Sequence, residues 1–250
     1  LRKFIDCTHE QYAARFQEEF GKTIRGIFMD ETRFLNALPW TKDFPEEFKR
    51  RKGYDVVPLL YQLVTDGPES RAVRYDYYDV CADLMREATF QQIYDWAEEH
   101  GIQTTGHVLG EETLASQSRY NIDIMRQFSA FHLPGIDHLG NGIGSLDAKI
   151  CSSAAHNYGR DIVNSESFGP CGWGMTMEPL IKISNWLYQQ GINQHMMHGF
   201  YYSIRNERKN DWPPSYFYQW QDWDLIPQYA DMAARMSYML QAGVTETELL

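Results

Sequence analysis

Glutamates follow three of the short apolar runs that predict β-strands in this sequence: Glu31, the pair Glu111 and Glu112, and Glu166. A carboxyl group that is partly removed from water at the end of a strand has a raised pKa and can donate a proton. Glycoside cleavage uses one carboxyl as the acid and another as the nucleophile or base. Glu31, Glu166 and Glu111 are therefore the candidate catalytic residues, although any one of them alone is also typical of a solvated loop.

Four histidines also fall on or just after predicted strands: His107, His138, His195 and His198. With Asp30 and Asp137 nearby, these side chains are of the type that binds a divalent metal in hydrolytic enzymes. The sequence has no HxH or HExxH spacing, however, so hydrogen bonding to sugar hydroxyls or to carboxylates is the favoured interpretation and no metal ligand is assigned. The offset of three between His195 and His198 places them on opposite faces of a strand.

Aromatic residues make up 14% of the sequence and cluster in the segments predicted to follow strands. Aromatic rings can stack on the apolar faces of sugars, and they equally serve ordinary core packing. The side chains expected to contact a sugar are Asp30, Trp40, His107, Asp137, His138, Asn141, Trp173, His198, Tyr201 and Tyr202.

The elements that position these residues alternate between amphipathic helices and short apolar strands, which is typical of βα units and a parallel sheet. The strands are predicted at 24–31, 102–110, 135–140, 161–169 and 192–203. The helices are predicted at 4–20, 76–100, 114–131, 147–158, 178–190 and 226–241.

Candidate ligand-type residues end at least four of these strands, which favours a TIM-type (β/α)8 barrel over an open, doubly wound sheet with one switch point. Because such a barrel has eight strands, about three are expected to precede Leu1. We expect residues 1–250 to form a single barrel domain fragment, with 226–250 as the closing helix and exit segment.

The overall charge restricts the partner. A formal net charge of −11 and a pI near 5.2 argue against nucleic acid or an anionic membrane, both of which require basic patches. No apolar stretch is long enough to span a bilayer, and the 4 cysteines lack zinc-site spacing. The expected partner is a neutral oligosaccharide or glycoside, while oligomeric state and compartment carry no signal in the sequence.

Several motifs resemble glycoside hydrolase family 106, the α-L-rhamnosidase-like barrels. SSAAHNYGRDIVNSESFG at 152–169, GINQHMMHGFYYS at 191–203 and DWPPSYFY at 211–218 are similar to stretches of that family, in the same order. FMDET at 28–32, followed by WTKDFPEEFKRRKGYD at 40–55, extends the resemblance over nearly the whole chain. The resemblance implies a sugar-cleaving barrel and a possible calcium ion near the site, with no cofactor required for the chemistry.

One stretch departs from the family pattern, since PGIDHLGN at 134–141 stands where a Pro-Glu motif is expected. That departure leaves open both rhamnoside specificity with inversion and a retaining arrangement similar to the β-galactosidase clan. In that clan the acid follows the fourth strand and the nucleophile the seventh. Taking 192–203 as the eighth strand puts Glu31 and Glu166 at those positions.

The sequence therefore favours a glycosidase with Glu31 as the acid, Glu166 as the nucleophile or base, and Glu111 in reserve. Two other classes of function remain compatible with it. One is a carbohydrate-binding barrel without catalysis, and the other is a metal-dependent hydrolase or isomerase using strand-end His and Asp residues.

Overall fold

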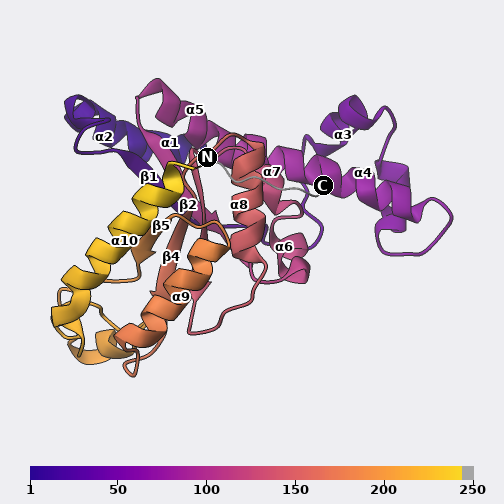
Figure 1. The fold of residues 1–250 in the computed structure, drawn as a ribbon. Coiled ribbons are helices and arrows are strands. Elements are labelled where there is room, and N and C mark those ends of the chain that lie inside the picture. Colours follow the sequence, from indigo (N-terminus) through magenta and orange to yellow (C-terminus); the bar gives the residue numbers. More distant parts are fainter. Residues whose placement is uncertain (244–250) are drawn as a thin grey trace. The chain divides into compact units, whose positions relative to one another are not determined.

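The fold was analysed in a computed structural model that describes residues 1–243 (Figure 1). The last part of the predicted exit segment, 244–250, lies outside the described residues. Contacts divide the chain into two compact units, whereas the sequence predicts a single domain. The first unit comprises Leu1–Thr104, Val108–Gly110 and Leu114–Phe131, and the second comprises Thr105–His107, Glu111–Thr113 and the chain from His132 onward.

The first unit is mainly helical. Its elements are α1 (Arg2–Cys7), α2 (His9–Phe16), β1 (Gly26–Thr32), α3 (Phe44–Lys52), α4 (Ser70–Met85), a π-helical turn (Arg86–Phe90), α5 (Gln91–Glu99), α6 (Leu114–Tyr120) and α7 (Ile124–Phe128), with 3-10 turns at Gln17–Glu19 and Val57–Leu63. The helix predicted at 4–20 is broken at Thr8, and the one predicted at 114–131 is broken between α6 and α7. The helix predicted at 76–100 is confirmed and begins earlier, at Ser70.

Helix α3 lies between the strand predicted at 24–31 and the helix predicted at 76–100, where the sequence predicted no element. Its local signals are nevertheless strong, because Pro45 stands in the first turn and Gly53 ends the helix with a φ of 83°. Phe44 and Phe48 are fully buried on its apolar side, in a cluster with Val56 and Tyr77. This cluster gives the first unit a core of its own.

The second unit carries the sheet that matters for the site. Its elements are β3 (Leu133–Leu139), α8 (Asp147–Asn157), β4 (Asn164–Gly169), α9 (Met177–Gln189), β5 (Gln194–Met197), 3-10 turns at Asn206–Asn210 and Trp223–Leu225, and α10 (Ile226–Gln241). Strand β2 (Gln103–Val108) contributes residues to both units. The strands follow the order β1-β2-β3-β4-β5, and β2 to β5 pair in parallel, as the βα pattern predicts.

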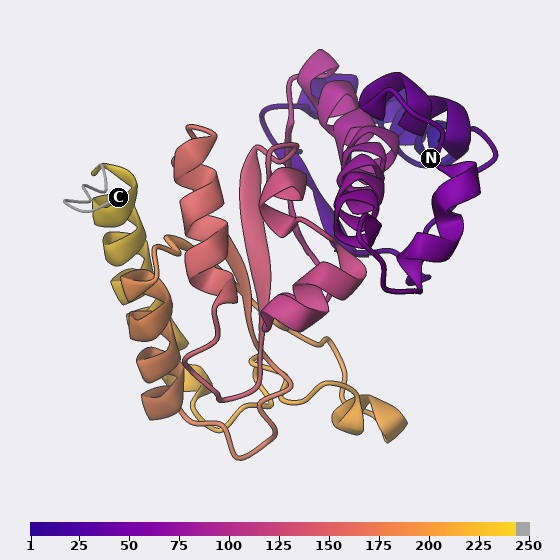
Figure 2. The same ribbon diagram turned by 90° about the vertical axis from the view of Figure 1, so that its right-hand side faces the viewer.

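Helices α8, α9 and α10 lie along one face of strands β3 to β5 (Figures 1 and 2). Helix α9 buries Leu180, Ile183 and Leu187, whose spacing defines one apolar stripe. The hydroxyl oxygens of Ser184 and Tyr229 lie 3.0 Å apart and join α9 to α10. No described helix is long and apolar enough to span a membrane.

The strands present two chemically different faces, because side chains alternate along a strand. On the helix-facing side, the His138 ring lies 5.4 Å from Trp186 of α9, and the His195 ring lies 4.7 Å from Tyr188. Asp137 and Glu166 are register partners on β3 and β4 and share the opposite face. The opposite face is therefore where the acidic candidates of these strands gather.

A glycine keeps the sheet tight beside this face. A Cβ at Gly135 would lie 2.8 Å from the carbonyl oxygen of Gly106 and 3.2 Å from the Cβ of Asn164. Both distances are shorter than normal contact, so β2 and β4 leave no room for a side chain there. Glycine in a strand often marks such a close approach.

We expect Gly135→Ala to lower the free energy of unfolding by about 1–3 kcal/mol, because the added methyl group forces the strands apart. Chemical denaturation of both proteins measures the difference. Gly142→Ala is the matched control, since a Cβ there meets no atom within 4 Å. Equal stability of the two variants would contradict the tight packing inferred at Gly135.

Candidate active site

Glu166 lies at the centre of a polar cluster on the open face of the second unit. Register places it beside Asp137 of β3 and Met196 of β5. Its Oε2 atom lies 3.0 Å from Nε2 of His107, and the side chains are 20% and 1% exposed respectively. The pair therefore forms a hydrogen bond that is largely shielded from water.

Strand β3 lies between His107 on β2 and Glu166 on β4. Gly106 pairs with Pro134, so the next residues along the two strands, His107 and Gly135, are neighbours. Gly135 in turn pairs with Asn164, two residues before Glu166. Strand β3 therefore carries no side chain at the register position next to His107.

His198 approaches the other oxygen of Glu166. Its Nε2 atom lies 3.9 Å from Oε1, and its backbone N–H donates to the carbonyl of Ser167 at 2.9 Å. The predicted strand 192–203 is shorter in the structure, because β5 ends at Met197. His198 thus occupies a loop position directly after β5, and His195 faces the helices, so the two histidines point to opposite sides as predicted.

Glu111 is the most deeply buried carboxylate among the candidates, with 2% of its surface exposed. Its Oε2 atom accepts a hydrogen bond from the backbone N–H of Asp137 at 2.8 Å. A charge-assisted bond of this kind stabilises the ionised form and fixes the loop after β2 to strand β3. The geometry gives Glu111 a supporting place behind the open face.

The charges of this cluster divide between His107 and Glu166. Burial alone lowers the pKa of His107, but the hydrogen bond to Glu166 and the negative charges of Glu111, Asp137 and Glu166 outweigh it and raise that pKa to about 9. The hydrogen bond from His107 holds the pKa of Glu166 below its ordinary value, against the opposing effect of burial. At neutral pH the pair is therefore an imidazolium and a carboxylate, which suits Glu166 to attack or to accept a proton.

Aromatic side chains from the segment after β5 surround His198. Its ring lies 6.3 Å from Tyr201 and 6.0 Å from Trp212. Tyr201 donates its hydroxyl hydrogen to the carbonyl of Trp212 at 3.0 Å, and Trp173 donates its indole N–H to the carbonyl of Lys209 at 2.6 Å. These bonds order the segment while leaving 44% of Trp212 exposed.

The remaining predicted residues fall into different surroundings. His138 is 3% exposed on the helix-facing side, and Tyr202 is 91% exposed. Asn141 donates its amide to the carbonyl of Cys171 at 3.3 Å. The structure therefore brings together His107, Asp137, Glu166 and His198 on one face, with Glu111 behind them.

Asp30, Glu31 and Trp40 belong to the first unit. Asp30 and Glu31 lie on β1, and Glu31 is exposed with a φ of 49°. Such a positive φ is uncommon for a residue other than glycine and is enriched at functional sites. Trp40 follows β1 on a loop, with 46% of its surface exposed and its ring 5.0 Å from that of Phe44.

One contributor to the site was missed in the sequence. Gly135 lies beside His107 on the neighbouring strand, and the signal was available, since an isolated glycine within an apolar strand indicates a close approach. Trp212 lies in the aromatic-rich segment after the last predicted strand, and no spacing rule connects it with His198. Among residues 1–243, no three His, Cys, Asp or Glu side chains are placed to hold one metal ion together.

The fold and site define an α/β protein whose ionisable side chains gather around parallel strands. A solved structure, the rhamnosidase from Novosphingobium sp. PP1Y, matches with a TM-score of 0.80 and 23% sequence identity, over 97% of this chain and 24% of that one. At this identity the match establishes the fold, and the chain spans 24% of that protein's length. No curated protein gives a significant match.

The family model described as alpha-L-rhamnosidase, glycoside hydrolase family 106, matches residues 1–250. The chain belongs to this family. The resemblance inferred from the sequence motifs is thereby confirmed.

The raised pKa of His107 has a consequence for stability. Its protonated form is favoured by folding, so the stabilisation is complete below the ordinary pKa near 6.5 and is lost as pH rises through about 9. We expect the free energy of unfolding to fall over this interval by on the order of 3 kcal/mol. His107→Gln should remove that fall, as measured by denaturation across the pH range, and an unchanged pH dependence would contradict the assignment.

Proposed function

We propose that the protein takes part in glycoside hydrolysis, with Glu166 as the nucleophile or base. The observation that supports this most directly is the shielded hydrogen bond between His107 and Glu166, at 3.0 Å, which holds the pKa of Glu166 below its ordinary value. Family membership supports a glycoside as the substrate, and α-L-rhamnosides are the substrate class that the family description favours.

In the proposed reaction, Glu31 protonates the glycosidic oxygen as the bond to the anomeric carbon breaks and its electron pair goes to that oxygen. Glu166 acts in the same step by one of two routes. In a retaining route its carboxylate bonds to the anomeric carbon as the glycosidic bond breaks, and a water molecule that gives its proton to Glu31 later displaces the carboxylate and releases the sugar. In an inverting route it accepts the proton of the water that attacks that carbon.

The two oxygens of Glu166 have different roles in this proposal. Oε2 is held by His107, which orients the carboxylate and lowers its basicity. Oε1 faces His198 at 3.9 Å, beyond hydrogen-bond distance, and is the oxygen we assign to the reaction. His198, Tyr201 and Trp212 lie next to it and are proposed to contact the sugar ring.

A closed barrel is the architecture we propose for the complete domain. The parallel pairing of β2 to β5 and the sheet order that follows the sequence support it. In that arrangement the candidate catalytic residues follow strands at one end of the barrel, and α10 is the closing helix. Asp30, Trp40, Asp137, Asn141, Trp173 and Tyr202 stay as proposed substrate-binding residues, whereas His138 is not proposed again because its buried ring lies on the helix-facing side, 5.4 Å from Trp186.

Calcium is implied by the family resemblance. The described residues contain no group of three or more acidic, histidine or cysteine side chains that fits such an ion. We therefore assign no step of the reaction to a metal.

Glu166→Gln should abolish hydrolysis of activated aryl α-L-rhamnosides by the full-length protein, with kcat reduced by at least about a thousandfold, because an amide cannot attack carbon or accept the proton.

Glu31→Gln should reduce the rate of cleavage most for substrates with poor leaving groups, because these need a proton from the acid. Glu112→Gln, an exposed neighbour of Glu111, is the control and should leave the rate unchanged. Activity of Glu166→Gln near the parent level would remove the assignment, and sugar binding without turnover in the parent would favour a binding module.

The alkaline limb of the pH profile tests the supporting charge of Glu111. If activity requires the His107 imidazolium, kcat/KM should fall as pH approaches about 9, where His107 loses its proton. Glu111→Gln removes a negative charge that raises the pKa of His107, so the fall should move to lower pH. An alkaline limb that stays in place in this variant would show that Glu111 does not act through His107.

A further inference from the structure

The loop after β1 is held by α4 in an unusual way, because its backbone is fixed while its large apolar side chains face outward. Leu35 and Leu38 are 84% and 41% exposed, and Trp40 is 46% exposed. Exposed apolar side chains are ordinary when scattered singly, but three within six residues of one loop call for a physical reason.

The fixing contacts come from two tyrosines of α4. Tyr78 donates its hydroxyl hydrogen to the carbonyl of Ala37 at 3.2 Å, and Tyr77 donates to the carbonyl of Pro39. Burial raises the pKa of Tyr77, so its hydroxyl keeps its proton and remains a hydrogen-bond donor at neutral pH. Two carbonyls on either side of Leu38 are thereby tied to one helix.

Packing completes the support on the side of Trp40. The Trp40 ring contacts Phe44 at 5.0 Å between centroids, and Phe44 contacts Tyr77 at 5.1 Å. Phe44 is 2% exposed and Tyr77 is 1% exposed. Trp40 therefore rests on a rigid base formed by α3 and α4.

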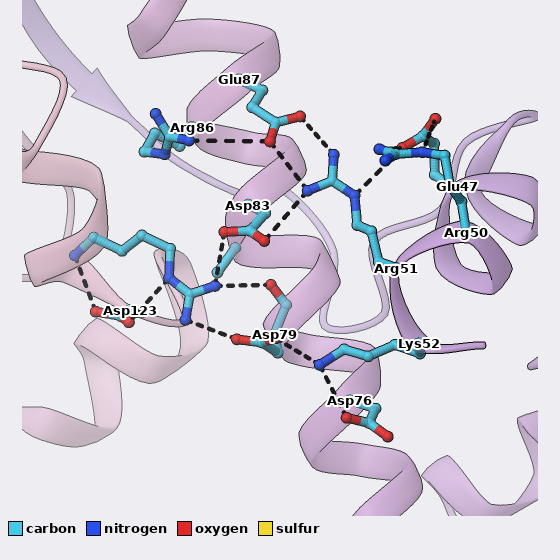
Figure 3. Close-up of polar contacts among 12 residues, drawn as sticks. Glu47, Arg50, Arg51, Lys52, Asp76, Asp79, Asp83, Arg86, Glu87 and Asp123 are labelled. Carbon is cyan, nitrogen blue, oxygen red and sulfur yellow. Dashed lines mark hydrogen bonds and ion pairs between the residues drawn. The ribbon is translucent and has the colours of Figure 1, made fainter. Parts of the chain in front are cut away.

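Behind this base, ion pairs join α3 to α4, as Figure 3 shows. Arg51 of α3 forms a two-pronged contact with Glu87, at 2.6 and 3.0 Å, and a longer contact with Asp83 at 3.3 Å. Lys52 lies 2.6 Å from Asp79 and 3.0 Å from Asp76. Asp76, Asp79 and Asp83 of α4 stand three or four positions apart, on one face of the helix, and Glu87 follows four positions later on the π-helical turn that continues it.

A third cation ties α7 into the same cluster. Arg126 of α7 lies 2.7 Å from Asp79 and 2.9 Å from Asp83. The Arg51, Lys52 and Arg126 side chains are 16%, 17% and 27% exposed, so these charges are less screened than ordinary surface pairs. Networks of partly buried charges fix orientation better than single exposed pairs do.

We propose that Tyr77 and Tyr78 are positioning residues that fix the loop 33–43 and so present Trp40 to the glycoside substrate, with the Arg51 ion pairs holding their base in place. The inference rests on the proposed function, since it deepens the role of Trp40 there. Because the folded protein already orders this loop, substrate binding loses no conformational entropy by ordering it.

Removing one hydroxyl tests the proposal with little other change. In the full-length protein, Tyr78→Phe and Tyr77→Phe should each raise KM for an aryl α-L-rhamnoside by about three- to tenfold, with kcat within about twofold of the parent. Tyr75→Phe is the matched control on the same helix, because Tyr75 is 70% exposed and its hydroxyl makes no hydrogen bond within residues 1–243. An unchanged KM in both tyrosine variants would overturn the proposal.

A double-variant comparison separates positioning from general destabilisation. If Tyr78 acts through Trp40, Tyr78→Phe should add little to the KM of Trp40→Ala, whereas independent effects would multiply. Arg51→Met should raise KM in the same direction as Tyr78→Phe. Multiplied effects, or an Arg51→Met KM equal to that of the parent, would contradict the corresponding part of the proposal.

Hydrogen exchange gives a readout that does not depend on activity. The amide of Phe34, which begins the loop 33–43 and donates to the carbonyl of Tyr120 at 2.9 Å, should exchange faster in Tyr77→Phe and Tyr78→Phe than in the parent or in Tyr75→Phe. If the parent shows no turnover but the exchange result holds, the proposed function fails while the positioning of the loop stands. Equal amide exchange rates in all four proteins would contradict the proposal that the tyrosines fix the loop.

Discussion

The hydrogen bond between His107 and Glu166 is the constraint on which the site depends. It joins β2 to β4 across the intervening strand, where Gly135 is the register neighbour of His107 and adds no side chain. The bond also sets the charges, because it favours the charged form of both partners: it raises the pKa of His107 and lowers the pKa of Glu166. Position and protonation state thus have one physical origin.

Glu111 shows how buried charge can serve a neighbouring group. Its carboxylate is almost completely removed from water and is satisfied by a backbone N–H of β3. A buried carboxylate is costly unless it is hydrogen-bonded and near a positive charge. Glu111 accepts a hydrogen bond from the backbone N–H of Asp137. Its negative charge also raises the pKa of His107, and the protonated His107 supplies the positive charge. The carboxylates around His107 are therefore best understood as one electrostatic unit.

Much of this arrangement was predictable from the sequence. Alternating helices and apolar runs indicated the parallel strands, and the alternation of side chains along a strand separated His195 from His198. The sequence could not show that His138 faces the helices, because a strand buried on both faces gives no polar side to read. Helix α3 was not predicted, although Pro45 and Gly53 are helix signals at its two ends.

The pairing of His107 with Glu166 was also beyond sequence reasoning, since the two residues are 59 positions apart and register alone brings them together. The positive charge of His107 at neutral pH can be measured by nitrogen-15 NMR of its ring, recorded between about pH 6 and pH 10. Both ring nitrogens should carry protons at neutral pH, and the ring should lose one of them near pH 9. A neutral ring at pH 7, titrating at or below the ordinary value of about 6.5, would contradict this prediction.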